Sequence, residues 1–269
     1  MNERLALTQS TCPVRTWRQF ARMVRSRGCS LLSRLDDFPN SILVTGCQRS
    51  GTTMLSRIFT RSHGMVNYWF GSDDELDAAL ILAGVVQHTP RGRYCFQTTY
   101  LNECVHEYFT HDTGHKMVWV LRHPFAVVRS MLHNWGGFAL NELFSACGSH
   151  LLDEKSRKFY DWFGVWGVSR VRRACLAYCG KVSQLFQLNG RLRHNHIIVV
   201  DYEGMVKDKE RVLPELYRFI DLPYQARYAD MIHGRSLGKH SSLSERERAL
   251  VESLCMPTYE AARKLVSLP

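Results

Sequence analysis

A short apolar run that leads directly into a glycine loop constrains the fold of this chain more than any other feature. Residues 41–46 read SILVTG, which is typical of a buried parallel strand, and residues 51–62 carry apolar side chains at helical spacing. Between them, Gly46 and Gly51 bracket four residues in the frame G-x-x-x-x-G. In a strand, loop and helix of this order, backbone N–H groups converge near the positive end of the helix dipole. The segment therefore predicts a phosphate-binding loop.

The side chains of this loop do not match those that bind a nucleoside triphosphate. Arg49 places a permanent cation within the loop, while Thr52 and Thr53 offer hydroxyl donors. A P-loop triphosphatase has a lysine directly after the second glycine, and Thr52 stands there instead. Because the same frame also occurs in ordinary strand-to-helix turns, its ligand has to be identified from a second motif.

That second motif follows another apolar run, KMVWVL at 116–121. A triphosphatase needs an aspartate after its second strand to help hold magnesium, whereas this run ends in Arg122. Ser130 lies on the helix predicted after Arg122, so a cation and a hydroxyl group can bind a phosphate monoester together. We expect the neighbouring Arg129 to be a surface charge. The pattern predicts a ligand with two anionic groups, bound without a metal, and argues against ATP hydrolysis.

The rest of the chain alternates between strand and helix patterns, which predicts an α/β fold: a single domain with a central parallel β-sheet flanked by helices. We assign residues 41–269 to this domain and residues 1–40 to a basic N-terminal helical extension. Further strands are expected at 65–70, 94–99 and 196–200, and helices at 74–86, 125–133, 140–190 (broken at glycines), 207–220 and 245–265.

The charge of the chain leaves three classes of partner open. With 35 basic and 25 acidic side chains the net charge is +10, which suits nucleic acid, an anionic membrane surface or a small anionic ligand. We expect no nucleic-acid binding, because no recognised motif accompanies the charge. Arginines at helical spacing between 15 and 25 alternate with apolar residues, so we expect an amphipathic helix docked on the domain, with a membrane-surface helix as the alternative.

Composition indicates a soluble intracellular protein. The longest apolar run, residues 79–86, is far shorter than the roughly 18–20 residues that cross a bilayer, and we expect no transmembrane segment and a cytoplasmic location. The nine cysteines are scattered, without C-x-x-C pairs or zinc-ligand spacing. We therefore expect them to be reduced packing residues.

Four segments together resemble sulfotransferases that use 3′-phosphoadenosine 5′-phosphosulfate (PAPS). TGCQRSGTT at 45–53 resembles their 5′-phosphosulfate loop, and VWVLRHPFAVVRS at 118–130 resembles their 3′-phosphate motif. Residues 201–223 resemble a later strand–helix segment whose tyrosine lies near the adenine, and residues 236–247 a loop that closes over the nucleotide. The resemblance covers about 41–265 and implies PAPS as sulfuryl donor, 3′-phosphoadenosine 5′-phosphate (PAP) as product, and no metal. The cofactor-binding residues that it implies are Cys47, Gln48, Arg49, Ser50, Gly51, Thr52, Thr53, Arg122, Ser130, Tyr202 and Lys239.

The resemblance leaves the catalytic base open. Cytosolic relatives supply a lysine and a catalytic histidine from the third strand, but the comparable segment here reads FQTTYL. Other branches of the family use a carboxylate after the second strand, where SDDEL offers Asp73, Asp74 and Glu75. We assign catalytic roles to Arg49 and to one of these acids, with Glu75 ahead of Asp74. The alternatives are an acid-rich first helical turn without a catalytic role, or a histidine as base.

The acceptor is not encoded in any motif. Aromatic residues between 135 and 166 lie where relatives build acceptor pockets; of these, we expect Trp162 and Trp166 to pack in the core because they share a helix face. We predict transfer to a hydroxyl or amine of a small molecule, for example a natural product. Two alternative functions remain: a P-loop phosphoryl transferase or kinase, and a non-catalytic nucleotide- or polyanion-binding module.

Overall fold

A parallel four-stranded sheet forms the centre of the computed structural model, which describes residues 14–28, 30–71, 73–111, 114–193, 195–232 and 243–268. The spatial order of the strands is β2-β1-β3-β4, and all neighbours are parallel. The strands are β1 (Ile42–Gly46), β2 (Cys95–Gln97), β3 (Lys116–Leu121) and β4 (Ile197–Asp201). The fold is thus the α/β arrangement that the sequence predicts.

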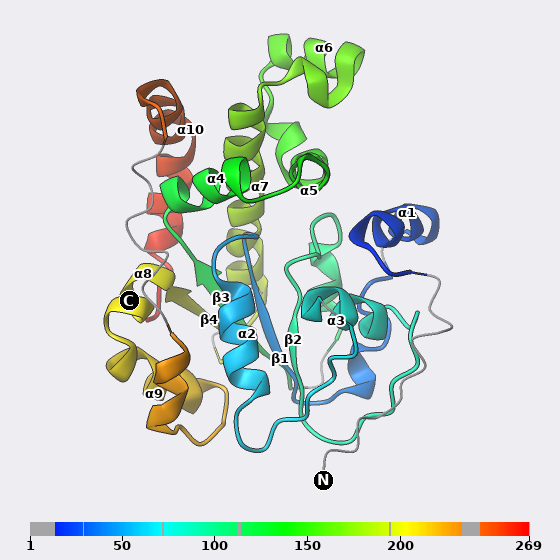
Figure 1. Cartoon of the computed structure of the whole chain (residues 1–269), viewed down its shortest axis with the longest axis vertical. Helices are drawn as coiled ribbons and strands as arrows, with labels where there is room; N and C mark the ends of the chain where they lie inside the picture. The colour runs from blue at the N-terminus through cyan, green and yellow to red at the C-terminus, as the bar shows by residue number, and fades with distance from the viewer. Residues whose placement is uncertain are drawn as a thin grey trace.

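Helices cover the sheet on both sides (Figure 1). They are α1 (Trp17–Arg27), α2 (Thr52–Thr60), α3 (Asp74–Leu82), α4 (Pro124–His133), α5 (Gly137–Leu143), α6 (Glu154–Phe163), α7 (Arg170–Arg191), α8 (Tyr202–Lys207), α9 (Lys209–Phe219) and α10 (Glu245–Arg263). Short helical turns are η1 (Leu35–Asp37), η2 (Val105–Phe109), η3 (Phe144–Gly148), η4 (Ser149–Leu151), η5 (Gly164–Gly167) and η6 (Ala226–Met231).

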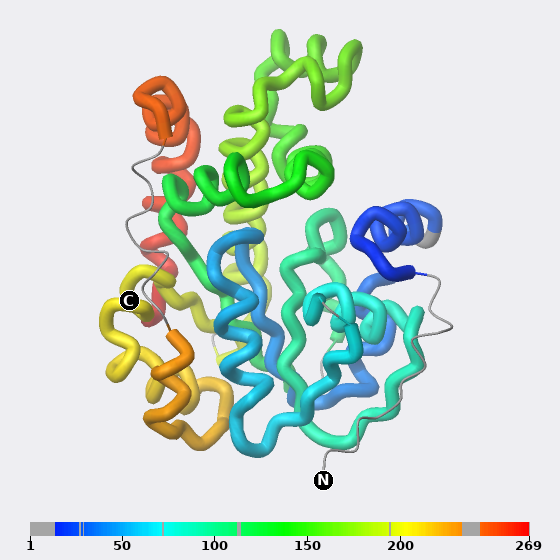
Figure 2. The backbone as a smooth tube through the Cα atoms, viewed as in Figure 1, coloured from blue at the N-terminus to red at the C-terminus, as the bar shows by residue number. Residues whose placement is uncertain are grey.

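Successive residues of each strand face different hydrophobic cores, because side chains alternate across a strand. In β3, Val118 and Val120 pack with α2, α8 and α9, whereas Met117, Trp119 and Leu121 pack with α3, α4 and α7. Both faces of the sheet are therefore buried, which explains why its strands read as nearly continuous apolar runs. On the second face α10 runs alongside α7 (Figure 2).

The strand expected at 65–70 is wrong. Within this segment only Met65 makes a parallel bridge, to Arg93. The carboxylate of Asp77 accepts hydrogen bonds from the backbone N–H groups of Phe70 and Gly71, at 2.9 and 2.8 Å. A buried side chain thus satisfies donors that a neighbouring strand would otherwise bind.

The amphipathic helix expected near the N-terminus is present as α1 and is docked on the domain. Phe20 is buried, and its ring and that of Trp17 contact Tyr100. The assignment of residues 1–40 as a separate extension stays a prediction, because buried residues before position 40 belong to the same hydrophobic core as α3 and α7.

The cysteines differ from expectation at one position. Cys104 is disulfide-bonded, so the expectation that every cysteine is reduced is wrong there. Six others are free and buried: Cys47, Cys95, Cys147, Cys175, Cys179 and Cys255. No helix in the described part of the chain is long and apolar enough to cross a membrane.

Candidate active site

The predicted site residues come together at the carboxyl edge of the sheet. Gly46, the last residue of β1, pairs with Val120, and Leu121, the last residue of β3, pairs with Asp201 at the end of β4. The loops that follow these strands therefore start side by side. They carry Arg49, Arg122 and Tyr202, which lie far apart in the sequence. In open parallel sheets this edge is where ligands bind.

Two glycines give the phosphate loop its shape. Gly46 and Gly51 have φ angles of 143° and 95°, which side chains other than glycine rarely tolerate. A Cβ atom at Gly46 would lie 2.5 Å from the carbonyl oxygen of Val120, and one at Gly51 would lie 2.2 Å from Cε2 of Tyr202. The loop therefore packs directly on β3 and on the tyrosine that follows β4.

We predict that Gly51→Ala abolishes PAP binding, measured by calorimetry, because the methyl group must displace either the loop or the ring of Tyr202. Gly64→Ala is the matched control: Gly64 also has a positive φ, of 87°, but a Cβ atom there meets nothing within 4 Å. Backbone strain of this kind costs about 1–3 kcal/mol, so both variants should lose stability while only the first loses the ligand. Unchanged PAP affinity in Gly51→Ala would contradict the assignment of this loop.

The two anion sites predicted from separate motifs form one hydrogen-bonded network. Nε of Arg49 donates to Oγ of Ser130 at 3.0 Å, and Nη1 of Arg122 donates to the carbonyl oxygen of Arg49 at 3.0 Å. The guanidinium group of Arg122 also lies 4.2 Å from the ring centroid of Tyr202. Burial, together with repulsion from Arg122, lowers the pKa of Arg49. A bound anion would relieve that repulsion, so the site is suited to a negatively charged ligand.

A cavity of about 340 Å³ lies over this network and is lined by most of the predicted cofactor residues. Arg129, which we expected to be a surface charge, is half-buried and lines this cavity from α4, the helix that also carries Ser130. The hydroxyl group of Ser50 is buried without a hydrogen-bond partner among the described residues. The lining residues are Gln48, Arg49, Gly51, Thr52, Thr53, Glu75, Gln97, Thr99, Arg122, Ala126, Arg129, Ser130, Asn134, Trp135 and Tyr202.

Glu75 lines this cavity and accepts hydrogen bonds from two residues of the FQTTYL segment. The hydroxyl group of Thr99 donates to its Oε1, and Nε2 of Gln97 donates to its Oε2 at 2.9 Å. Gln97 also donates to Oγ1 of Thr52, at 3.2 Å, which joins the acid to the phosphate loop. Neither Gln97 nor Thr99 was predicted as a site residue, because neither side chain ionises and the pattern FQTTYL signals only a strand.

The surroundings of Glu75 raise the pKa of its carboxyl group to about 8. Burial is the main cause, and the negative charges of Asp73 and Asp74 add to it. The hydrogen bond from Thr99 and the positive charge of buried Lys181 act in the opposite direction. A carboxylate with a pKa in this range can accept a proton near neutral pH.

The two neighbouring acids have structural partners instead. Both carboxylate oxygens of Asp74 accept hydrogen bonds from Arg57, at 2.9 and 3.0 Å. Asp73 caps the N-terminus of α3 by accepting from the backbone N–H groups of Glu75 and Leu76, and its Oδ2 accepts from Nε1 of Trp17 at 2.7 Å. Of the three acids in SDDEL, Glu75 is the one that lines this cavity.

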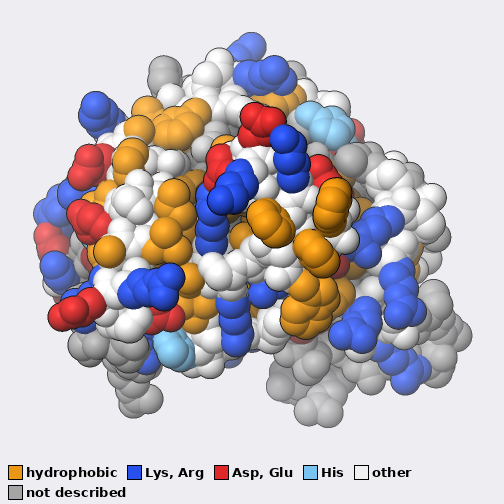
Figure 3. Space-filling view, turned by 90° about the horizontal axis from the view of Figure 1, so that it is seen from above, with side chains coloured by type: hydrophobic (Ala, Val, Ile, Leu, Met, Phe, Trp, Pro, Cys, Tyr) orange, Lys and Arg blue, Asp and Glu red, His pale blue; other side chains and the backbone are white. Residues whose placement is uncertain are grey.

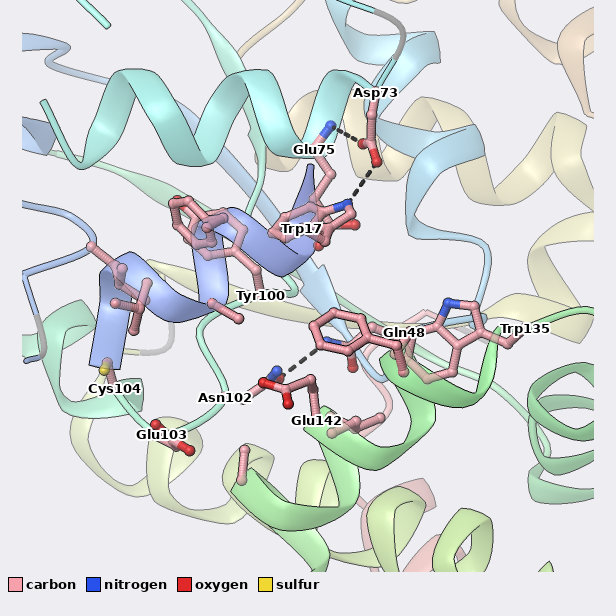
Figure 4. Close-up of a pocket in the computed structure, with 18 of the residues that line it drawn as sticks. Trp17, Gln48, Asp73, Glu75, Tyr100, Asn102, Glu103, Cys104, Trp135 and Glu142 are labelled. Atoms are coloured by element: carbon pink, nitrogen blue, oxygen red, sulfur yellow. Dashed lines mark hydrogen bonds between the residues drawn. The ribbon is translucent and has the colours of Figure 1, made fainter. Parts of the chain in front are cut away.

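A second, larger cavity of about 590 Å³ opens beside the first, and its walls combine five aromatic side chains with eight charged ones (Figure 4). Helix α1 contributes Trp17 and Phe20, the loop after β2 contributes Tyr100, and Trp135 and Phe138 come from the segment around the start of α5. An ion pair between Arg25 and Glu142 joins α1 to α5 across this cavity. The volume is within the range of small-molecule sites, roughly 300–1,000 Å³.

Other aromatic residues of the 135–166 segment lie elsewhere. Phe144 is fully buried in the core. Trp162 and Trp166 are 83% and 85% exposed, so the expectation that they pack in the core is wrong. Helical spacing places two side chains on one face but does not determine whether another element covers that face.

The side chain of Cys47 is buried, and burial raises the pKa of its thiol, so this residue can meet a ligand only through its backbone. Lys239 lies outside the described residues, and its role stays a prediction. Within the described ranges, no cluster of three or more His, Cys, Asp or Glu side chains is placed to hold a metal ion.

Comparison with known proteins identifies the family. The sulfotransferase domain family matches residues 39–248, which is most of the chain. This chain belongs to the sulfotransferase domain family. A search of curated proteins found no match.

Solved structures show the same fold in other sulfotransferases. A sulfotransferase domain from the curacin biosynthetic pathway is 15% identical with a TM-score of 0.51, over 86% of this chain and 99% of its own. A mouse sulfotransferase in complex with PAP is also 15% identical with a TM-score of 0.51, over 88% and 93%. A sulfotransferase from Mycobacterium avium has the same identity and TM-score, over 96% and 88%. At this identity the likeness concerns the fold alone.

Proposed function

We propose that this sulfotransferase-family protein transfers the sulfuryl group of PAPS to a hydroxyl or amine of a small molecule. The observation that carries the proposal is that the two cavities share one wall. Gln48, Arg49, Thr53, Glu75 and Trp135 line both of them. A donor in the smaller cavity and an acceptor in the larger one would meet beside the phosphate loop and Glu75.

The residues of the smaller cavity fit PAPS, which supplies an activated sulfuryl group whose leaving group is a phosphate. The loop amides, Arg49, Thr52 and Thr53 would hold the 5′-phosphosulfate. The unpaired Ser50 hydroxyl and the glycine at position 51, where a Cβ atom would meet Tyr202, support a ligand held close to this backbone. Arg122 and Ser130 would hold the 3′-phosphate, and Tyr202 would lie near the adenine.

Two sets of side chains of this chain then carry out the transfer: a base and a set of hydrogen-bond donors. Glu75 accepts the proton of the attacking hydroxyl or amine, while Gln97 and Thr99 hold its carboxylate in place. Arg49 and the threonine hydroxyls donate to the phosphate on which negative charge develops. Because Gln97 contacts both Glu75 and Thr52, one side chain fixes the base relative to the phosphate loop.

Calorimetry with PAP in the presence of EDTA tests the proposal. We expect tight binding that does not need a metal. ATP binding that requires magnesium would instead indicate a phosphoryl transferase. A protein that binds neither nucleotide, but binds heparin or DNA in a salt-sensitive way, would be a non-catalytic polyanion-binding module.

A narrower prediction concerns the 3′-phosphate. Ser130→Ala should weaken PAP binding about tenfold, because a hydrogen bond to a charged group contributes about 1.5–3 kcal/mol. The affinity for 5′-AMP, which has no 3′-phosphate, should not change. Ser253→Ala is the control, because the hydroxyl group of Ser253 donates to the carbonyl oxygen of Leu250 on α10. Equal losses for both nucleotides would place Ser130 away from the 3′-phosphate.

A further inference from the structure

Four aromatic side chains lie exposed at the tip of the helix pair α6–η5, away from both cavities. We call them the aromatic tip: Phe159, Trp162, Phe163 and Trp166, which are 49%, 83%, 56% and 85% exposed. Single exposed apolar residues are ordinary, but four exposed aromatic ones within eight positions of the chain mark a surface that binds a partner.

Three of the four rings lie side by side. Phe159 and Phe163 stack with ring centroids 6.3 Å apart, and the ring of Trp162 lies 6.4 Å from that of Phe163. Trp166 follows Trp162 by four residues, beyond Gly164, whose φ of 58° turns the chain.

Contacts on the inward-facing side of α6 and η5 hold the aromatic tip in place. Tyr160 packs edge-on against buried Phe144, with ring centroids 5.6 Å apart, and Nη2 of Arg157 donates to the carbonyl oxygen of Ser149 at 2.6 Å. At Gly167 a Cβ atom would lie 2.5 Å from the carbonyl oxygen of Phe159, so η5 packs directly on α6. These contacts fix which face of α6 turns inward and leave the aromatic tip outside.

The position of α6 suits a flat partner. Helix α6 projects at the upper end of the molecule, beyond the N-terminal end of α7 (Figure 1). Figure 3 looks onto this end and shows hydrophobic side chains among Lys and Arg side chains. A stable protein partner usually covers about 800 Å² on each side, which a tip of four side chains does not offer by itself. A projecting aromatic tip can enter a planar layer without contact elsewhere.

Basic side chains accompany the aromatic tip. Lys155 and Lys158 lie one helical turn before Phe159 and Trp162, on the same stripes of α6. Among the acids of this region, Asp153 pairs with Arg172 and Glu154 pairs with Lys158. These pairs leave Lys155, Arg157 and Arg170 against Asp161, an excess of positive charge.

We propose that the aromatic tip binds an anionic membrane surface. The Trp and Phe rings enter the headgroup region, which such rings favour, while Lys155, which lies one helical turn before Phe159, meets the lipid phosphates. The lipid surface complements both the apolar rings and the excess positive charge. This proposal stands whether or not the protein transfers sulfate.

Sedimentation with lipid vesicles tests the proposal on the full chain. We expect binding to vesicles of phosphatidylcholine with phosphatidylserine, weaker binding to phosphatidylcholine alone, and loss of binding at high salt. The double variant Trp162→Ser with Trp166→Ser should bind about tenfold less. Brominated lipids should quench the tryptophan fluorescence of the wild type and quench the double variant much less.

The control is Phe186→Ser, which removes a 38% exposed phenylalanine from α7 instead of the tip. It should bind vesicles like the wild type, and all three proteins should bind PAP or unfold thermally alike, which shows that they are folded. Equal vesicle binding by the double variant and the wild type overturns the proposal. So does a wild-type dimer in light scattering that the double variant loses while neither binds vesicles, since the tip would then join two copies of the chain.

Discussion

Glu75→Gln is expected to lower kcat by about 10²–10⁴-fold while leaving the affinity for PAP within about twofold of the wild type. The amide keeps the shape of the side chain and its contacts with Gln97 and Thr99 but cannot accept a proton. Turnover of labelled PAPS with an acceptor found by screening measures the first quantity, and calorimetry measures the second.

The pH dependence of kcat, compared between the wild type and Glu75→Gln, identifies Glu75 as the base. Because the pKa of Glu75 is raised from 4.5 to about 8, the wild-type base is mostly protonated at neutral pH. Its kcat should therefore rise with pH and level off above about pH 8, and the glutamine variant should lack this rise.

The free energy of unfolding should change with pH in the opposite direction to kcat. Between about pH 4.5 and pH 8 the folded protein binds a proton at Glu75 that the unfolded chain has released, so the free energy of unfolding falls as pH rises. The Tm of Glu75→Gln relative to the wild type should thus be higher at pH 9 than at pH 5.

Glu252→Gln, on the exposed face of α10, is the control for this substitution and should leave all three measurements unchanged. If Glu75→Gln keeps wild-type turnover, the base is another residue. Asp74→Asn would then be tested next, although its pairing with Arg57 predicts mainly a loss of stability.

Arg49→Ala is expected to reduce kcat by about 10²–10³-fold, because one lost donor to a developing negative charge raises the barrier by roughly 2.7–4 kcal/mol. The effect on fold stability should be small by comparison, since the side chain faces the cavity and donates to Ser130 rather than packing in a core. Single-turnover kinetics would separate the chemical step from donor binding.

Arg211→Ala provides the matched control for this substitution. Arg211 forms a half-exposed ion pair with Asp208 on α9, and exposed pairs contribute only about 0–1 kcal/mol. The control should keep wild-type kcat and a nearly unchanged Tm. If Arg49→Ala keeps the wild-type kcat, Arg49 has no role in the transfer, and the donors to the leaving phosphate are the loop amides and threonines.

The sequence determined much of the fold because β1 and β3 are short apolar runs, of which the first ends at Gly46 and the second is followed by Arg122. The strand at Lys116–Leu121 and the loop between Gly46 and Gly51 were predicted closely, since local sequence specifies both. The strand at 65–70 failed because a tertiary contact, the carboxylate of Asp77 on two backbone N–H groups, replaced the sheet. Local propensity does not report such contacts.

The sequence also predicted the two anion-binding motifs. Only the tertiary structure decided how their side chains contact each other. Arg49 and Ser130 lie 81 positions apart and meet because β1 and β3 are neighbours in the sheet. The raised pKa of Glu75 likewise depends on burial against the segment after β2, and the aromatic tip is exposed because no described element covers α6 there. Spacing along the chain thus determined which residues share a helix face or a loop. Packing between distant segments decided which of them meet, which lose water and which remain at the surface.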